Sequence, residues 1–449
     1  MKTILNDELI SFLNESHNEY LAVANIKEIL LKNGFKELKE NEKWILKENS
    51  SYFFSRNSNS LIAFKTPYKI HKDELYFKIV STHLDSPSLK LKENPALIEN
   101  GYEKWKVEVY GGLIYQSYVD RPLGIAGRVV YQKDNQILSK IVDSKKAIAI
   151  IPNVAIHQNR NINTDFKYNP QIDLLPLVAL NNTKESIFDA FLKDISQEND
   201  IISYDLYFYN FDKAQYIGIN DDLISGQKED DLASAFISLK SLIETEDVSF
   251  SNSIKVASFF NNEETGSLSF SGADSDLLRN FINKIAFSYQ LNEEEKNNAI
   301  KKSFVISADN GHAIHPYHPE MSDNKNICKL NEGILVKFNS NMAYTSDALT
   351  SAFIKTLLNK NNIPYQVFFN RSDVRGGSTL GNISISQVSM LTCDIGLPQL
   401  AMHSAYETLG TKDTESMFSL MKEFYKKEFK IEEGKITFLT HENRAIKSL

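Results

Sequence analysis

A run of β-branched and aromatic residues, Ile254–Phe260, stands just before two adjacent glutamates, Glu263 and Glu264. Its composition predicts a buried β-strand that ends at the turn residues around the glutamates. In open α/β sheets, ligands bind in the crevice outside the carboxyl ends of the strands. Two neighbouring carboxylates placed there can divide the chemistry, because one can bind a metal ion while the other transfers protons. The alternative is a solvated acidic turn, since Asn, Glu and Gly are ordinary turn residues.

Two other predicted strands are followed by residues of the same chemical kind. Leu75–Val80 leads to His83, and Phe304–Ser307 leads to Asp309. We expect these side chains and the two glutamates to converge along one edge of a sheet. Imidazole nitrogens and carboxylate oxygens are the ligands that zinc, cobalt and manganese accept in proteins.

Further candidates complete a set of two histidines and three carboxylates. Asp230 is suited to bridge two metal ions, with its neighbour Asp231 as the alternative, and His403 supplies the second imidazole. Asp85 follows His83 closely enough to hydrogen-bond its ring or to orient a neighbouring base. Taken singly, such residues are more often turn or cap residues, so the joint occurrence is what favours a metal site.

A rival metal site consists of three histidines spaced by three residues, His312, His315 and His318. They would share one face of a helix, but Pro316 opposes a continuous helix. We therefore expect a loop here, in which metal binding is the minority interpretation.

Other catalytic patterns are missing from the sequence. There is no Gly-x-Ser-x-Gly nucleophile motif, and neither Cys328 nor Cys393 stands beside a partner signature. The Tyr110–Gly112 segment lacks the spacing of a phosphate-binding loop. Two cysteines offer no disulfide framework, which favours a reducing compartment and a cytoplasmic protein.

Length and composition limit the class of protein further. At 449 residues the chain exceeds the size at which single cores stop growing, so two or more domains are expected. The net charge of −8 gives no electrostatic footprint for nucleic acid and no basic patch for an anionic membrane. No stretch approaches the ~20 apolar residues of a membrane span.

Helical periodicity predicts a first helix over Leu5–Leu13 with Asn6 as its N-cap, and a second over Tyr20–Leu31. Strands alternate with helices near both ends of the chain, which predicts an α/β sandwich. Between these parts, short strands and many turns predict an inserted β-rich domain. We expect a catalytic domain built from residues 1–92 and 216–449, interrupted by an inserted domain at residues 93–215.

Together the motifs resemble those of the aspartyl aminopeptidase family of metallopeptidases, the M18 family, and the resemblance runs from about Leu5 to Glu407. It is carried by the following segments: His83–Pro87, Asp120–Arg121, Leu123–Arg128, Ile151–His157, Asn169–Gln171, Leu174–Pro176, Asp230–Leu232, Glu263–Ser267, Ser307–Asp309, His315–Pro316 and Pro398–Ser404. The resemblance implies a metallo-aminopeptidase α/β/α sandwich with an inserted dimerisation domain. It further implies homodimers that assemble into a homododecamer.

The resemblance also assigns roles by position. It implies two divalent ions, zinc or else cobalt or manganese, bound by His83, Asp230, Glu264, Asp309 and His403, with Asp230 bridging them. It implies that Glu263 is the general base, that Asp85 supports the site, that His157 reaches the active site of a partner subunit, and that Lys337 and Tyr344 contact the substrate. The residues before the glutamates are Asn261–Asn262, where the family usually has Asp-His.

We thus expect a two-metal aminopeptidase that removes N-terminal residues, acidic ones in the first place, from peptides. One alternative keeps the metals but changes the substrate, as in a broad or glutamyl aminopeptidase or an amidohydrolase acting on acylated amino acids. The other alternative is a noncatalytic assembly protein of the same fold. An intact general base and a full ligand set argue against it, because a scaffold needs neither.

Overall fold

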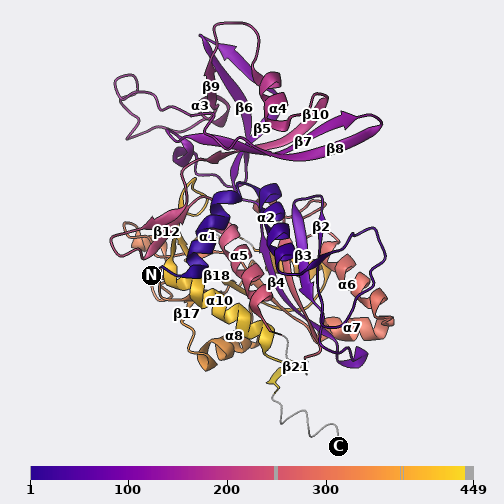
Figure 1. Cartoon of the computed structure of the whole chain (residues 1–449). Coiled ribbons are helices and arrows are strands. Elements are labelled where there is room, and N and C mark those ends of the chain that lie inside the picture. The colour runs from indigo at the N-terminus through magenta and orange to yellow at the C-terminus, as the bar shows by residue number, and fades with distance from the viewer. Residues whose placement is uncertain (1, 247–250, 375, 378, 440–449) are drawn as a thin grey trace, which may run out of the picture.

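The computed structural model describes residues 2–246, 251–374, 376–377 and 379–439 of the chain. Figure 1 shows a main body of strands and helices, with a smaller β-rich layer at one end of it. The predicted α/β class is confirmed. Within the described ranges, no helix combines the length and the apolar character that crossing a lipid bilayer requires.

The main body is built on one large sheet, whose strand order is β1-β2-β3-β13-β4-β14-β18-β16-β17. Its strands are β1 (Lys36–Glu37), β2 (Ser51–Arg56), β3 (Ser60–Lys65), β4 (Tyr76–His83), β13 (Ser253–Phe260), β14 (Phe304–Ala308), β16 (Ile334–Lys337), β17 (Tyr365–Phe368) and β18 (Leu391–Gly396). The central strands β13, β4, β14 and β18 run parallel to one another. Their carboxyl ends therefore lie along the same edge of the sheet.

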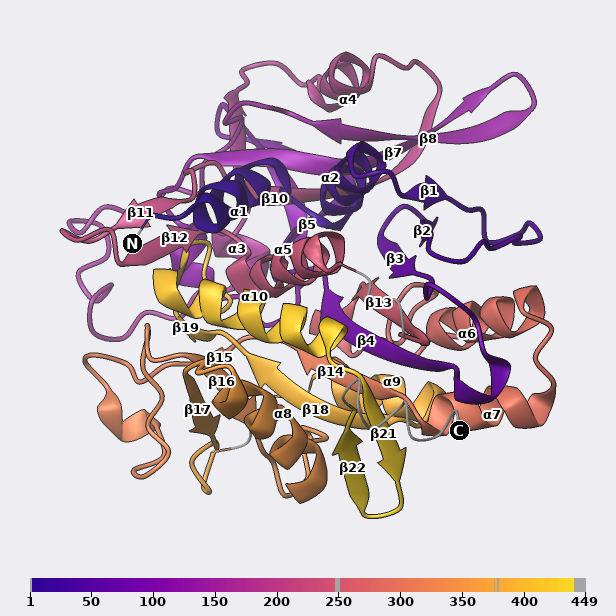
Figure 2. The same cartoon turned by 60° about the horizontal axis from the view of Figure 1, so that its bottom comes forward.

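Helices cover both faces of the large sheet, as Figure 2 shows. One face packs against α1 (Ile4–Glu15), α2 (Glu19–Lys32), α5 (Glu229–Glu244), α8 (Ala348–Lys360) and α10 (Thr411–Lys426). The other packs against α6 (Leu277–Ser288), α7 (Glu293–Lys301) and α9 (Leu380–Gln387). In strand β4, neighbouring side chains point to opposite faces of the sheet. Tyr76 and Val80 join the core on the first face, and Phe77 and Ile79 join the core on the second. All eight residues of β4 are buried, because both faces of the strand are covered.

The N-terminal helix begins earlier than its sequence predicts. Thr3 is the N-cap, and its hydroxyl oxygen accepts a hydrogen bond from the Asn6 backbone amide over 3.2 Å. The prediction of Asn6 as the N-cap is wrong. Its buried side chain instead donates to the carbonyl oxygen of Thr411 over 2.9 Å and so joins the first helix to α10.

A second sheet forms the β-rich layer at the end of the molecule, with the order β8-β7-β10-β5-β6-β9 and antiparallel neighbours throughout. Its strands are β5 (Ser88–Glu99), β6 (Tyr102–Tyr110), β7 (Leu123–Lys133), β8 (Gln136–Asp143), β9 (Leu177–Leu180) and β10 (Ile201–Asn210), accompanied by α3 (Pro170–Asp173) and α4 (Phe188–Ser196). This layer has its own core around Trp105. Because β5 follows shortly after β4, the second sheet is joined to the large sheet at the edge where His83 lies.

A third sheet lies close to the same edge and has the order β11-β12-β20-β19-β15. Its strands are β11 (Gln215–Ile217), β12 (Leu223–Gly226), β15 (Gly311–His312), β19 (Pro398–Leu400) and β20 (Glu407–Gly410), while β21 (Phe429–Glu432) and β22 (Lys435–Phe438) form a separate hairpin. The third sheet connects segments that flank the predicted metal ligands, because β12 precedes Asp230, β15 follows Asp309, and His403 lies between β19 and β20.

Candidate active site

The predicted ligands come together at the carboxyl edge of the large sheet. Strand β4 ends at His83, β14 ends directly before Asp309, and the short helical turn that holds Glu264 follows β13. Asp230 stands at the start of α5, and His403 occupies the turn before β20. These residues are distant in sequence, so the parallel strand order is what brings them together.

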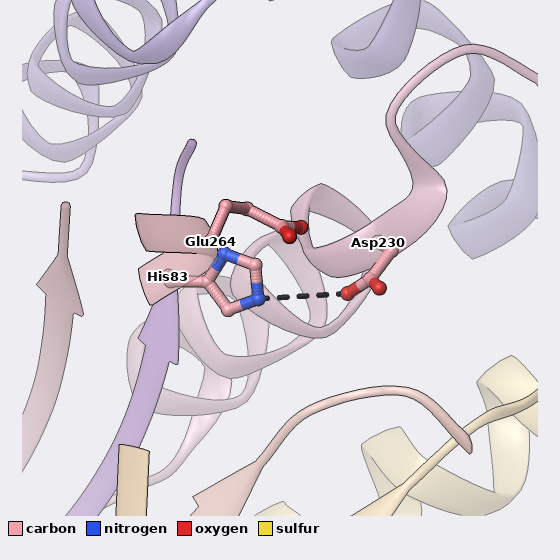
Figure 3. Close-up of side chains that lie close together, drawn as sticks. All are labelled: His83, Asp230 and Glu264. Carbon is pink, nitrogen blue, oxygen red and sulfur yellow. Dashed lines mark ion pairs between the residues drawn. The ribbon is translucent and has the colours of Figure 1, made fainter. Parts of the chain in front are cut away.

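The Asp230 carboxylate lies between the two histidines. Its Oδ1 is 3.5 Å from His83 Nε2, and its Oδ2 is 3.6 Å from His403 Nε2. His403 Nε2 is also 3.3 Å from Glu264 Oε2, and His83 Nε2 is 4.0 Å from Asp309 Oδ1. Figure 3 shows His83, Asp230 and Glu264 pointing toward one another. These three residues form one group of possible metal ligands, and Asp230 also belongs to a second group.

Asp231 also reaches this region. Its Oδ2 accepts a hydrogen bond from the His83 backbone amide over 3.3 Å, and it forms a close carboxylate cluster with Asp230 and Asp309. Asp230 belongs both to this cluster and to the group of His83, Asp230 and Glu264. Of the two neighbours, Asp230 is therefore the one that belongs to both groups.

The donor set fits divalent cations. Asp230 Oδ1, Asp231 Oδ1 and Glu264 Oε1 are buried and lack a hydrogen-bond partner among the described residues. Burial, with the negative charge of Asp230, raises the pKa of Glu264 well above its usual value, and burial raises that of Asp309 to about 6 although Lys337 opposes the shift. Buried carboxylates without partners are costly, and a cation between them and the two imidazoles would satisfy them.

Glu263 lies beside this group without belonging to either cluster. Burial raises the pKa of its carboxyl to about 8, and the negative charges of Asp309, Asp85 and Asp230 add to the rise while His83 opposes it. A carboxylate with an affinity for protons near neutral pH is suited to general acid–base work.

Asp85 holds the chain segment that carries both glutamates. Its Oδ1 accepts from the Glu263 backbone amide and its Oδ2 from the Glu264 backbone amide, each over 3.1 Å. Its Oδ1 also lies 3.5 Å from His83 Nδ1. Burial alone would raise the pKa of Asp85, but the histidine and the hydrogen bonds lower it. The residue is placed to orient one imidazole and two glutamates together.

The segment Tyr110–Ile114, which begins with the last residue of β6 in the second sheet, also contacts the site, and sequence reasoning missed this. The Tyr110 hydroxyl donates to Asp85 Oδ2 over 2.7 Å, and the Gly112 carbonyl oxygen lies 3.0 Å from His403 Nδ1. Gly111 has φ +70°, and a Cβ there would lie 3.1 Å from Glu264 Cβ. The adjacent glycines after a strand were the available signal, since they mark close backbone approach.

Lys337 and Tyr344 lie next to each other behind Asp309. The buried Lys337 Nζ donates to the carbonyl oxygens of Asp309 and Asn310 over 3.0 and 2.9 Å and lies 4.7 Å from the centre of the Tyr344 ring. Burial would lower the pKa of Lys337, but Asp309 and other negative charges raise it. The ammonium therefore keeps its charge at the border of the site.

A cavity of about 580 Å³ is lined by the loop histidines His312, His315 and His318 together with Phe368, Arg371 and Gln399. His312 is exposed to the cavity, but the surrounding protein desolvates its imidazole and lowers its pKa; Lys337 and His403 lower the pKa further, and Asp230 opposes the shift. The three histidines lie on β15 and a following loop, as Pro316 predicts. His312 therefore lies within electrostatic reach of Asp230 and His403, a relation that its sequence spacing did not reveal.

His157 stands apart from the other candidates within one chain. It lies exposed in the segment between β8 and α3, and in the described part of the chain no hydrogen bond or ion pair joins it to the site residues named above. A single subunit thus brings together every predicted site residue except this one.

The comparisons with known proteins agree on one family. The family model described as "Aminopeptidase I zinc metalloprotease (M18)" matches residues 12–425. The protein named "Probable M18 family aminopeptidase 2" of Clostridium novyi is 40% identical over 428 residues, which cover 93% of this chain and 98% of the relative.

Solved structures share the fold of this chain. In the cryo-EM structure of the Ape4 and Nbr1 complex, a chain with 30% sequence identity superposes with a TM-score of 0.89, covering 94% of this chain and 85% of that one. The structure of the S. cerevisiae mApe1 dodecamer superposes with a TM-score of 0.81 at 24% identity, covering 94% and 96%. A sequence relationship over nearly the whole length, combined with a shared fold, shows that the chain belongs to the M18 family of zinc metalloprotease aminopeptidases.

Proposed function

We propose that this aminopeptidase uses two metal ions to remove N-terminal residues, preferentially Asp and Glu, from peptides. The observation that carries the proposal is the placement of Asp230, whose two carboxylate oxygens face one histidine each. His83 and Asp309 would hold one ion and Glu264 and His403 the other, with Asp230 shared. When bound, the pair of ions supplies a Lewis acid for the peptide carbonyl and lowers the pKa of the attacking water.

Glu263 is the proposed general base. It takes a proton from the water whose oxygen attacks the carbonyl carbon, and it returns a proton to the amine nitrogen when the C–N bond breaks. The position of Glu263 supports this role, because it directly precedes the proposed ligand Glu264 in the turn after β13 and belongs to neither group of possible ligands. Asp85 contributes by fixing the backbone amide of Glu263 over 3.1 Å.

The preference for acidic residues is supported by Lys337. Two of the three N–H groups of its ammonium are occupied by the carbonyl oxygens of Asp309 and Asn310, which leaves one for a substrate carboxylate. The same contacts favour a second candidate, a broad aminopeptidase in which Lys337 serves only to hold Asp309 in place. A substrate series distinguishes the two.

We further propose a homodimer, with the second sheet as the dimerisation layer, that assembles into a homododecamer and places His157 in the partner's site. The exposure of His157 and the dodecamer formed by S. cerevisiae mApe1 support this arrangement. The buried, unpaired thiols of Cys328 and Cys393 are consistent with our proposal that the enzyme works in the cytoplasm.

The test uses metal-reconstituted protein and dipeptides that differ only in their first residue, with an N-acetylated acidic dipeptide as the amidohydrolase control. Asp and Glu substrates should have the highest kcat/KM, and the blocked dipeptide should not be cleaved. Equal rates for Asp, Ala and Leu would establish broad specificity. Full turnover by the Glu263→Gln variant with its metals bound would disprove the assignment of the base.

A further inference from the structure

Glu407, the first residue of β20, connects two of the proposed metal ligands through its carboxylate. Its Oε1 accepts a hydrogen bond from the His403 backbone amide over 2.6 Å, and its Oε2 accepts one from the Asp230 backbone amide over 3.0 Å. The residue is almost completely buried, at 1% exposure. We propose that Glu407 is a positioning residue that sets the placement of Asp230 relative to His403. This inference rests on the proposed two-metal function.

The position of Glu407 is fixed by the third sheet. In the antiparallel pairing of β12 with β20, Glu407 stands opposite Gly226, the last residue of β12. The chain then runs from Gly226 into α5, so the ladder brings the Glu407 side chain close to the backbone of Asp230. One carboxylate can therefore hold two segments that are far apart in sequence.

The backbone of the turn that contains His403 is strained, so a hydrogen bond that holds it in place matters there. Ala401 has φ +54° and His403 has φ +68°, and side-chain-bearing residues rarely adopt this left-handed region. The hydrogen bond from the His403 amide to Glu407 holds the turn in this conformation. Without it the backbone can relax, and the imidazole would move away from Asp230 and Glu264.

Glu407 and Asp85 each hold two residues of the site by accepting hydrogen bonds from their backbone amides. Asp85 accepts the backbone amides of Glu263 and Glu264, whereas Glu407 accepts those of Asp230 and His403. Each oxygen of Glu407 accepts one of these amides, and Glu407 belongs to neither group of possible ligands, so it stands beside the proposed site as a positioning residue. A glutamine there offers one acceptor oxygen, and its NH₂ group would face an N–H donor.

The experiment is a Co²⁺ titration of the metal-free protein, followed by visible absorption and by equilibrium dialysis. It compares the wild type with Glu407→Gln and with Glu103→Gln as the matched control. Glu103 is also a fully buried carboxylate that accepts a backbone amide, that of Ile187 over 3.2 Å, but it lies in the second sheet. We expect Glu407→Gln to bind Co²⁺ about 10- to 100-fold more weakly, with a shifted absorption band. The control should match the wild type.

Wild-type affinity and spectrum in Glu407→Gln would overturn the inference, and so would equal losses in both variants, because they would show a general cost of burial. If Glu407→Gln does not fold, the wild type still gives an answer through NMR of protein labelled with ¹⁵N-histidine. The His403 amide, assigned by its absence in His403→Ala, should resonate downfield and exchange slowly with solvent. Rapid exchange would refute the hydrogen bond. A wild-type protein that takes up no Co²⁺ would instead overturn the proposed metal site.

Discussion

The Tyr110 hydroxyl donates to Asp85 Oδ2 over 2.7 Å, which joins a strand of the second sheet to the carboxylate that holds the two glutamates. The Tyr110 oxygen in turn accepts from the Asn262 side-chain amide over 2.9 Å. The second sheet is therefore in direct contact with the site of the main body.

Replacing Tyr110 with Phe should lower kcat about tenfold, which corresponds to about 1.4 kcal/mol of transition-state free energy. The reason is that Asp85 loses a donor and the Asn262 amide loses its acceptor. We expect the free energy of unfolding to fall by about 1–3 kcal/mol. Steady-state kinetics and urea unfolding measure both effects.

The control for this variant is Tyr204→Phe, because the Tyr204 hydroxyl also donates a hydrogen bond, to the Lys92 carbonyl oxygen over 2.7 Å, within the second sheet. It should lose stability while keeping the wild-type kcat. Identical kcat values in the two variants would contradict a role of Tyr110 in the site.

The shared position of Asp230 predicts unequal effects on metal content. Glu264→Gln should retain about one tightly bound zinc ion per chain, whereas Asp230→Asn should retain close to none, since both ions lose a charged ligand. Elemental analysis after dialysis gives the content, and a chelator should abolish wild-type activity until zinc is returned.

Asp413→Asn is the matched control for the metal analysis. Asp413 is a buried carboxylate on α10 that accepts the backbone amides of Asn331 and Gly333, away from the proposed ligands. Its metal content should equal that of the wild type. Retention of a full zinc complement by Asp230→Asn would rule out a bridging role.

The proposed action of His157 across a subunit boundary predicts complementation. His157→Ala and Glu263→Gln should each be nearly inactive alone. After dissociation and reassembly together, random pairing gives half mixed dimers with one intact site each, so about one quarter of wild-type activity should return. A mixture no more active than its components would refute the arrangement.

A buried ion pair on the other side of the sheet from α6 predicts the response of stability to acid. Lys78 Nζ donates to Glu428 Oε1 over 2.7 Å, and both side chains are almost fully buried. Burial would raise the pKa of Glu428, but Lys78 and hydrogen bonds from Tyr76 and Ser251 lower it below its ordinary value. A lowered folded-state pKa gives stability that is fully present above the unfolded pKa of about 4.5 and is lost as pH falls through the folded value.

Glu428→Gln should therefore cost about 3–5 kcal/mol at pH 7, because it leaves the Lys78 ammonium buried without its counter-charge. The difference from the wild type should shrink below about pH 4.5. Urea unfolding of the metal-free proteins at both pH values tests this expectation. Equal stability at pH 7 would show that the pair does not stabilise the fold.

The sequence predicted the strands of the site well because buried parallel strands have a plain local signature. Phe304–Ser307 and Ile254–Phe260 became β14 and β13 with nearly the same bounds. The convergence of His83 with Asp309 then followed from the general rule about strand ends.

The remaining contacts depend on tertiary structure. Nothing near Asn6 in the sequence shows that its amide will bond to Thr411, and nothing near Glu407 shows that it will face Asp230. The structure gives a reason for asparagine at position 262, which the sequence alone did not. Asn262 has φ +60°, a conformation that asparagine tolerates.

The proposed ligands are distributed along most of the chain, with His403 close to its C-terminal end. A ribosome-bound chain that has not yet extended beyond β19 can carry the first four of these residues in order, but it lacks the fifth. On this proposal the second ion cannot be held until the turn between β19 and β20 has been made. A chain that stops before this turn would therefore keep His83, Asp230, Glu264 and Asp309 but lack the second imidazole of the proposed site.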